Sequence, residues 1–254
     1  MIIQYMSDLH LEFRDNLQFI QNNPIVAETD ILILAGDVIP IRDIKQTSSF
    51  LDHLSAQFKA VYWVPGNHEY YRAKLDRFKS SMKSSIRDNI FLVNNTTEII
   101  SGVRFIFSTL WTKISEANMF EIQNRLNDFH AITVEDRPFS AWQYNALHED
   151  SLNFLQQTLH QFFAGPSVVV THHVPTFLHY PAMYKGDILN EAFAVELHDF
   201  IADHGPDAWI FGHHHVNIPA FSIGKTQMLT NQLGYVARGE NRNFSTQKTF
   251  SISL

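Results

Sequence analysis

The stretch Gly66-Asn67-His68-Glu69 places an amide ligand and an imidazole side by side at the end of an apolar run. Residues 61–64 have the composition of a strand, and Pro65-Gly66 ends this strand in a turn. Side chains that follow strands commonly build the sites of α/β proteins. Asn67 and His68 could therefore belong to a metal or catalytic site, although such a tripeptide also occurs in ordinary turns.

Polar groups follow four other apolar runs in the same way. The runs are residues 2–6, 30–35, 168–170 and 208–211, and the polar residues just after them include Asp8, His10, Asp37, His172, His213 and His215. Two pairs have a spacing of two residues, which puts both side chains on one face of an extended chain. Each pattern alone is weak, but five strand ends that all carry possible ligands are improbable by chance.

Together these side chains offer carboxylate, amide and imidazole groups to a metal. This donor set suits Mn, Fe, Zn or Co better than Mg. Seven ligands are too many for one catalytic ion, whereas two ions about 3.5–4 Å apart and bridged by a carboxylate would use them all, as in two-metal hydrolases. The chain has no cysteine, which excludes thiolate ligands and disulfides.

The elements that must position these residues alternate between strand and helix. Residues 48–59 carry apolar side chains at helical spacing and predict a crossover helix between two parallel strands. Residues 142–163 and 192–204 predict the helices before the last two ligand-bearing strands. Such βαβ units deliver the carboxyl ends of their strands to one edge of a sheet.

A second sheet and two irregular segments complete the expected architecture. Its short strands are predicted at residues 91–93, 97–100, 103–107, 218–223, 227–230 and 249–254. Residues 71–87 are rich in Lys, Arg and Ser and predict an exposed helix. Residues 109–142 lack a sustained period and are interpreted as a cap-like excursion over the site, or as a helical packing element without a role in chemistry. Trp111, Asn127-Asp128 and residues 180–184 are candidate pocket residues.

Composition restricts the class of protein. The chain of 254 residues is 45% hydrophobic, which is enough for the core of one domain spanning residues 1–254. A formal charge of −7 argues against non-specific nucleic-acid binding, which needs clustered Lys and Arg. The apolar amino terminus is too short for a signal sequence, and no run approaches the length of a membrane span. We expect a cytoplasmic protein that does not bind membranes.

In chain order the polar residues form five blocks. These are Asp8-x-His10, Gly36-Asp37, Gly66-Asn67-His68-Glu69, His172 and Gly212-His213-x-His215. As a set they resemble the calcineurin-like metallophosphoesterases. The resemblance implies an α/β fold, namely a four-layer α/β/β/α sandwich with two central mixed β-sheets. It also implies a dinuclear centre at the carboxyl ends of the strands, with two divalent or mixed-valence ions of Mn, Fe or Zn.

The resemblance also implies a role for each block. One metal would be held by Asp8, His10 and His215, the other by Asn67, His172 and His213, and the bridging ligand would be Asp37. His68 would stay free of metal, contact the substrate phosphate, and stabilise the transition state or protonate the leaving group. His172 is preferred to His173 as a ligand, His214 is expected to point away, and Glu69 is interpreted as a carboxylate that supports the ligands from behind or starts a helix.

The expected function is hydrolysis of a small phosphate mono- or diester by metal-bound hydroxide, with nucleotides among the candidate substrates. The alternative is a non-catalytic metal-binding interaction scaffold with the same fold. Such a scaffold would be expected to lose ligands or His68, and this chain retains all of them. Many relatives carry a charged residue shortly after Gly-Asp, whereas residues 38–41 are apolar here, so the sequence offers no charged substrate contact at that point.

Overall fold

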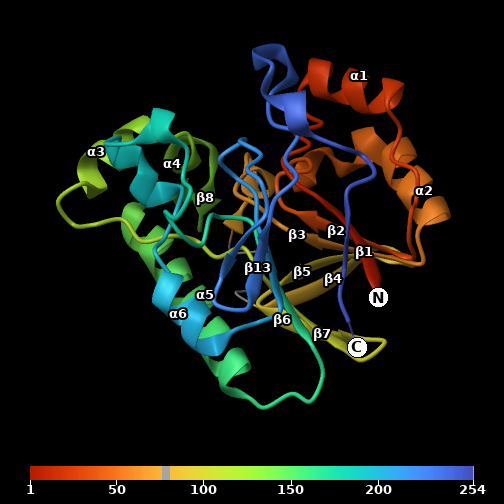
Figure 1. Ribbon diagram of the computed structural model, residues 1–254. Coiled ribbons are helices and arrows are strands. Elements are labelled where there is room, and N and C mark those ends of the chain that lie inside the picture. Colours follow the sequence, from red (N-terminus) through yellow and green to blue (C-terminus); the bar gives the residue numbers. More distant parts are fainter. Residues whose placement is uncertain (76–80, 254) are drawn as a thin grey trace.

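Two β-sheets pack face to face between layers of helices (Figure 1). The computed structural model describes residues 1–75 and 81–253, and within them each of the two sheets has six strands. The first sheet has the order β14 (Thr249–Ser251), β1 (Ile2–Met6), β2 (Ile31–Ala35), β3 (Ala60–Val64), β5 (Ile90–Asn94) and β4 (Met82–Arg87). The second has the order β12 (Phe221–Ile223), β13 (Thr226–Leu229), β11 (Ala208–Ile210), β10 (Ser167–Thr171), β7 (Val103–Ser108) and β6 (Thr96–Ile100). The expected α/β/β/α sandwich with two mixed sheets is confirmed.

The inner strands of both sheets are parallel, and the edge strands are antiparallel. In the first sheet β1, β2, β3 and β5 run in one direction, and in the second β7, β10, β11 and β13 do so. The sheets meet at their carboxyl ends, where the His172 ring lies 2.9 Å from the Ala35 carbonyl oxygen. Residues that follow β1, β2, β3, β10 and β11 therefore converge on one region.

Successive side chains along each strand point to opposite faces of its sheet. They form one apolar layer between the two sheets and one on each outer face. Residues such as Ile33 and Phe105 face the opposite sheet and are fully buried. The rings of Tyr62 and Phe107 stack across the two sheets at 5.3 Å. The other faces of the sheets carry residues such as Leu34, which pack under the helices. Strands buried on both faces explain the continuous apolar runs in the sequence.

The helices cover the outer faces and form one additional lobe. Helices α1 (Arg14–Asn22) and α2 (Ser48–Gln57) pack on the first sheet, and α5 (Ala141–His160) and α6 (His198–His204) pack on the second. The additional lobe contains α3 (Met119–Arg125), α4 (Asp128–Ala131), β8 (Thr133–Val134) and β9 (Arg137–Pro138). A separate apolar cluster that includes Trp111, Phe129 and Tyr144 holds this lobe on α5.

Short 3₁₀ helices connect several of these elements. They are η1 (Ile41–Thr47), η2 (His68–Tyr70), η4 (Ala182–Tyr184), η5 (Ile188–Ala192), η6 (Val236–Arg238) and η7 (Glu240–Asn243). The sequence patterns predicted neither these turns nor helix α1, because short or strongly polar segments carry little periodic signal. Helix α5 was predicted, and it begins at a capping box formed by Ser140 and Gln143.

The predicted helix over residues 71–87 is wrong at both ends of that range, and at its start residues 71–74 form a turn and a bridge to Thr133. Residues 76–80 lie outside the described residues, and Met82–Arg87 form β4, which pairs with β5 across a turn at residues 88 and 89. The strand lies at the edge of the sheet, and edge strands commonly carry charged side chains. The polar composition that suggested an exposed helix therefore belongs to an exposed strand.

Three further boundaries or placements differ from the sequence prediction. Helix α6 begins at His198 rather than at residue 192, because the carboxylate of Glu196 accepts the backbone N–H groups of His198 and Phe177. Strand β14 pairs with β1 and strand β5 with β3, so both belong to the first sheet. These strands pair with strands that lie elsewhere in the sequence. A local sequence pattern can predict a strand, but it cannot show to which sheet the strand belongs.

None of the helices within the described ranges combines the length and the apolar character that crossing a membrane requires.

Candidate metal centre

The seven predicted ligands follow five strands whose carboxyl ends meet. Asp8 and His10 follow β1, Asp37 follows β2, Asn67 follows β3, His172 follows β10, and His213 and His215 follow β11. Their side chains form two groups in which the possible ligand atoms lie within 4.8 Å of one another, Asp8 with His10 and His215, and Asp37 with His172 and His213. For these six residues the division agrees with the two metal positions implied by the family resemblance, with Asp37 in the second group. That these residues bind metal stays a prediction.

The first group joins the end of β1 to the end of β11. His10 Nε2 lies 2.9 Å from His215 Nε2, and His215 Nε2 lies 3.5 Å from Asp8 Oδ1. His10 and Asp8 are fully buried, and His215 is partly open to the cavity described below. Two imidazole nitrogens and a carboxylate oxygen therefore point at one small volume.

The second group surrounds His172. Its Nε2 atom lies 3.4 Å from Asp37 Oδ2, 3.2 Å from Asn67 Oδ1 and 3.0 Å from His213 Nδ1. Asp37 Oδ2 also lies 3.7 Å from His10 Nε2, which belongs to the first group. Asp37 is therefore the carboxylate that reaches both groups, as a bridging ligand must.

The outer nitrogens of three histidines have oxygen partners, as metal-binding histidines usually do. Nδ1 of His10 lies 3.2 Å from Glu12, Nδ1 of His172 lies 2.9 Å from a backbone carbonyl, and Nδ1 of His215 lies 2.8 Å from Glu240. These contacts favour a proton on Nδ1, which leaves Nε2 as an electron-pair donor. The donor set therefore fits divalent metal ions.

The backbone is strained at most of these positions. Five of the seven residues, Asp8, His10, Asp37, His213 and His215, have positive φ angles between 46° and 79°. Non-glycine residues in this region cost about 1–3 kcal/mol each and cluster at functional sites. The strain turns successive side chains at each strand end toward a common centre.

His68 lies beside the ligands without joining either group. Its ring stacks on Tyr71 at 4.1 Å, and its Nδ1 atom lies 2.8 Å from Glu12 Oε1. Burial alone would lower the pKa of His68, but the carboxylates of Asp37 and Glu12 raise it to about 9. A protonated imidazole next to a phosphate site can donate a proton to a leaving group.

The neighbouring histidines His173 and His214 lie outside both groups. Nδ1 of His173 lies 3.1 Å from the carbonyl oxygen of Thr109, and the ring packs against Trp111. His214 is buried beside Tyr180, with its Nδ1 atom against Gln232. Burial lowers the pKa of each to about 3. Both side chains lie outside the two ligand groups, and His214 also lines the cavity over the ligands.

The sequence model of the family described as calcineurin-like phosphoesterase matches residues 2–217, which is most of the chain. The chain belongs to this family. Phosphoesterases of this family use divalent metal ions, and the clustered ligands are consistent with that. The resemblance drawn from the five sequence blocks is therefore confirmed.

Two known proteins illustrate how far the likeness extends. The phosphoesterase is 31% identical to the uncharacterized protein L509 of Acanthamoeba polyphaga mimivirus, over 95% of this chain and 94% of that protein. The crystal structure of the phosphopantetheinyl hydrolase PptH from Mycobacterium tuberculosis superposes with a TM-score of 0.69 at 17% identity, covering 98% of this chain and 95% of that one. The second likeness concerns the fold.

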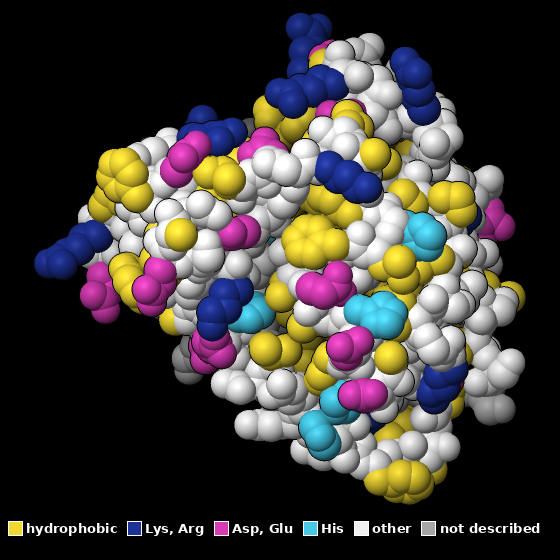
Figure 2. Space-filling model, turned by 60° about the vertical axis from the view of Figure 1, so that its left-hand side comes forward, with side chains coloured by type: hydrophobic (Ala, Val, Ile, Leu, Met, Phe, Trp, Pro, Cys, Tyr) yellow, Lys and Arg dark blue, Asp and Glu magenta, His cyan; other side chains and the backbone are white. Residues whose placement is uncertain are grey.

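A cavity of about 330 Å³ opens over the ligands of the phosphoesterase. Asp37, Asn67, His68, His213 and His215 form part of its lining. Figure 2 shows a face on which acidic and histidine side chains gather among hydrophobic ones, without a continuous patch of Lys and Arg among the described side chains. The cavity therefore gives a small molecule access to the predicted metal ligands.

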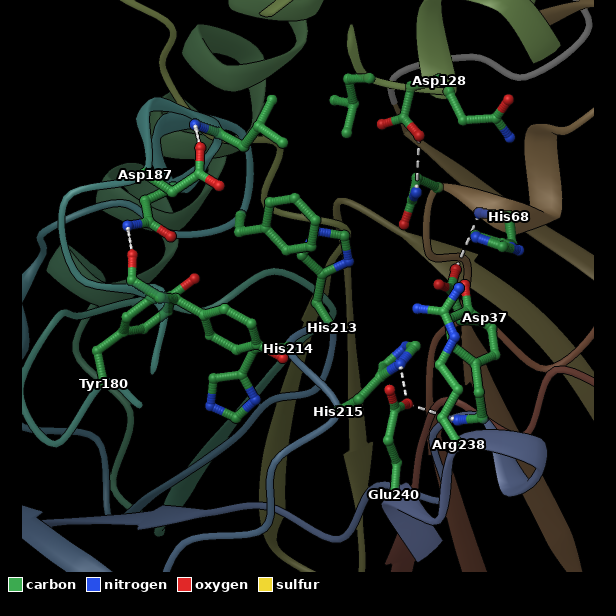
Figure 3. Close-up of a pocket in the computed structure, with 18 of the residues that line it drawn as sticks. Asp37, His68, Asp128, Tyr180, Asp187, His213, His214, His215, Arg238 and Glu240 are labelled. Atoms are coloured by element: carbon green, nitrogen blue, oxygen red, sulfur yellow. Dashed lines mark hydrogen bonds and ion pairs between the residues drawn. The ribbon is translucent and has the colours of Figure 1, made fainter. Parts of the chain in front are cut away.

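The walls of the cavity come from two segments outside the motif blocks. Residues 126–128 of the additional lobe contribute one wall, and Tyr180, Tyr184 and Phe193 contribute another. Tyr180 and Asp187 lie across the cavity from His68 and Asp37 (Figure 3). The pocket residues suggested by the sequence are confirmed for Asn127, Asp128, Tyr180 and Tyr184. Trp111 instead lies in the apolar cluster under the lobe.

Sequence reasoning missed Glu12 and Glu240, and it named Asp128 as a pocket residue without its contact to Asn67. Asp128 accepts a hydrogen bond from Asn67 Nδ2 at 2.8 Å and so turns the amide oxygen toward His172. Glu12 and Glu240 contact the ligand histidines from behind. Asp8, His10 and Glu12 occupy every second position of the sequence. This regular spacing could have identified Glu12 as a residue of the site. Asp128 and Glu240 reach the site from distant segments without any motif.

Proposed function

We propose that this phosphoesterase hydrolyses a small phosphate mono- or diester at a dinuclear metal centre. The observation that carries the proposal is the convergence of seven ligand side chains from five strand ends beneath one cavity. His68 lines the same cavity and belongs to neither of these two groups, although it also lies with His10 and Glu12 in a third set of possible ligands. This arrangement supports a catalytic site more than a scaffold, because a scaffold has no use for an accessible imidazole beside the ligands.

We assign the ligands to two metal ions according to the two groups that their side chains form. One ion would be held by Asp8, His10 and His215, the other by Asn67, His172 and His213, with Asp37 shared. Mn, Fe and Zn are the ions that suit these donors. When bound, the two ions would supply a water of lowered pKa and electrophilic assistance to the phosphoryl oxygens.

His68 would assist the leaving group. A water oxygen bonds to phosphorus while the bond from phosphorus to the ester oxygen breaks, and His68 Nε2 gives its proton to the departing oxygen. The proton on Nδ1 stays in the hydrogen bond to Glu12, and His68 regains its Nε2 proton from solvent. The hydrogen bond from Nδ1 to Glu12 and the place of His68 in the cavity lining support this role.

The lining of the cavity supports a small substrate with a flat or aromatic group. Tyr180, Tyr184 and Phe193 offer aromatic surface, and Arg238 offers a cation next to the Tyr235 ring. Nucleotides are one class of ester that could use both, because they carry a flat base and an anionic phosphate. The name of the M. tuberculosis protein adds phosphopantetheinyl esters to the substrates to be tried. The formal charge of −7 supports a compact ester over a long polynucleotide, and a cytoplasmic location is part of the same proposal.

The test combines metal loading with a panel of esters. The purified protein is loaded with Mn, Fe or Zn in turn, its metal content is measured, and hydrolysis of aryl and nucleotide mono- and diesters is followed. We expect two equivalents of metal and turnover of at least one ester. The His68→Ala variant should keep both metals and lose about 10²–10⁴-fold in kcat.

Two results would contradict the proposal. A protein that binds two metals yet is inert on every ester would favour the non-catalytic scaffold. An active protein in which His68→Ala leaves kcat unchanged would remove His68 from the mechanism.

A further inference from the structure

Glu12 contacts two histidines with different predicted roles. Its Oε1 atom lies 3.2 Å from Nδ1 of His10 and 2.8 Å from Nδ1 of His68. The two rings are edge to face, with centroids 4.4 Å apart. One carboxylate oxygen therefore lies behind both a predicted metal ligand and the predicted proton donor.

The contact selects which nitrogen of His68 faces the cavity. A carboxylate accepts a hydrogen bond and so holds a proton on Nδ1. Within the described chain, His68 Nε2 has no hydrogen-bond partner, and His68 lines the cavity. Stacking on Tyr71 fixes the plane of the ring. Hydrogen bond and stacking together point the reactive nitrogen at the substrate position.

No other carboxylate in the described chain makes a hydrogen bond to the His68 ring. Asp37 accepts the backbone N–H of His68 at 2.9 Å instead. The loop after Asp37 is apolar, and Val38 and Ile39 are buried under the helices that cover the first sheet. The orienting carboxylate of this chain is thus contributed by the segment after β1.

We propose that Glu12 is a positioning residue that fixes the tautomer and orientation of His68 and His10 together. The inference rests on the proposed function, since it assigns His68 the proton donated to the leaving group. One buried carboxylate thereby aligns the Nε2 atom of a metal ligand and the Nε2 atom of the proton donor. The competing reading is that Glu12 is itself a metal ligand, because its oxygen lies within 4.8 Å of both Nδ1 atoms.

The kinetic test uses Glu12→Gln, which preserves the shape of the side chain and removes its charge. We expect kcat to fall about 10–100-fold, as for other residues that orient metal-site histidines, while KM changes less than about threefold and two metals stay bound. The loss should be larger for an alkyl phosphate than for a p-nitrophenyl phosphate, because the alkoxide depends more on protonation. Glu12→Asp should recover part of kcat, and exposed Glu28→Gln is the matched control.

A double-mutant cycle separates positioning from a general structural effect. If Glu12 acts through His68, adding Glu12→Gln to His68→Ala should lower kcat much less than it does in the wild-type protein. An equal loss in both backgrounds would overturn the coupling. Loss of one metal equivalent in Glu12→Gln would make Glu12 a ligand and overturn the proposal, and so would an unchanged kcat on both esters.

A spectroscopic readout keeps the inference separate from the proposed function. In protein labelled with ¹⁵N-histidine and loaded with zinc, the His68 signals are assigned from their absence in His68→Ala. We expect the wild-type His68 to carry its proton on Nδ1 in a strong hydrogen bond, and Glu12→Gln to shift that signal. An unshifted signal would overturn the role of Glu12 even in an active enzyme. Inactivity of the wild-type protein would overturn the proposed function without affecting this measurement.

Discussion

Glu69 joins two ligand-bearing turns through one buried carboxylate. Its oxygens accept the backbone N–H groups of Asp37 and Gly66 at 2.9 and 2.7 Å, that of Val38 at 2.7 Å, and the indole N–H of Trp63 at 3.0 Å. The interpretation of Glu69 as a carboxylate behind the ligands therefore has a physical basis, because the turns that position Asp37 and Asn67 depend on it for their hydrogen bonds.

Glu69→Gln should destabilise the protein although the side chain keeps its shape. In glutamine one carboxylate oxygen is replaced by an NH₂ group, which cannot accept hydrogen bonds from the N–H groups that face it. Each buried donor left without a partner costs about 1–3 kcal/mol. Urea unfolding at fixed metal concentration should give a lower midpoint with an unchanged slope. The variant Glu116→Gln at an exposed position should match the wild type within about 0.5 kcal/mol. Equal stability of Glu69→Gln and wild type would contradict this role.

Arg238 adds a charge to the cavity that the motif blocks do not provide. Among the described lining residues it is the one lysine or arginine, and its guanidinium lies 4.9 Å from the Tyr235 ring centroid. An arginine held over an aromatic ring is preorganised to bind a phosphate oxygen or a second anionic group.

Arg238→Ala should therefore weaken substrate binding more than catalysis. A hydrogen bond to a charged group contributes about 1.5–3 kcal/mol, so KM is expected to rise about 10–100-fold while kcat changes a few-fold. Steady-state kinetics on the best ester of the panel measure both constants. Arg242→Ala is the matched control, because Arg242 is exposed nearby but does not line the cavity. A similar KM in both variants would contradict a role in binding.

At the scale of elements, glycine allows the strand ends to approach each other. A Cβ atom on Gly36 would overlap the His172 ring, and one on Gly212 would lie 2.5 Å from Asp8 Oδ2. A Cβ atom on Gly66 would overlap Asp37 Oδ1 and lie 2.7 Å from His172 Nε2. The glycines before Asp37, Asn67 and His213 are thus explained by ligands that face them from other strands.

Gly66→Ala should abolish tight metal binding at this centre. Gly66 does not have a positive φ, so the effect would come from the methyl group that displaces Asp37 and His172 rather than from backbone strain. Elemental analysis after dialysis should find fewer than two equivalents, with activity reduced by at least about 100-fold. Gly186→Ala is the control for backbone strain without crowding, because Gly186 has a φ of +83° but its methyl group would meet no atom within 4 Å, and the metal content of this variant should be unchanged. Two retained equivalents in Gly66→Ala would disprove the steric account.

The elements nearest the site were the most predictable from the sequence. Long apolar runs mark strands buried on both faces, and a ligand after each run marks the edge where parallel strands end. Strand β4 was mistaken for a helix because its exposed face is polar, and β14 was assigned to the wrong sheet because its partner β1 is far away in the sequence. Glu240 and Asp128 reach the ligands through tertiary packing, which no local spacing encodes.

At the scale of the whole molecule, the predicted metal centre joins the two sheets. Asp8, His10, Asp37 and Asn67 come from the first sheet, whereas His172, His213 and His215 come from the second. Both ligand groups contain residues of both sheets. Metal ions bound there would connect the two halves of the sandwich at its carboxyl edge, where strained backbone and buried charges oppose close packing.

Removal of metal should therefore lower the stability of the entire fold, not only of the site. A ligand that binds only the folded state stabilises it by RT ln(1 + [L]/Kd), about 2.7 kcal/mol at one hundred times Kd. For a chain of this length that corresponds to a rise of roughly 5–10 °C in Tm. Calorimetry with excess Mn²⁺ and after chelation measures the shift. In Asp37→Asn the shift should be much smaller, because the carboxylate that reaches both groups is gone. A Tm that stays the same while two equivalents bind would mean that the unfolded chain binds the ions as tightly as the folded protein, and a metal centre assembled by the fold would have to be rejected.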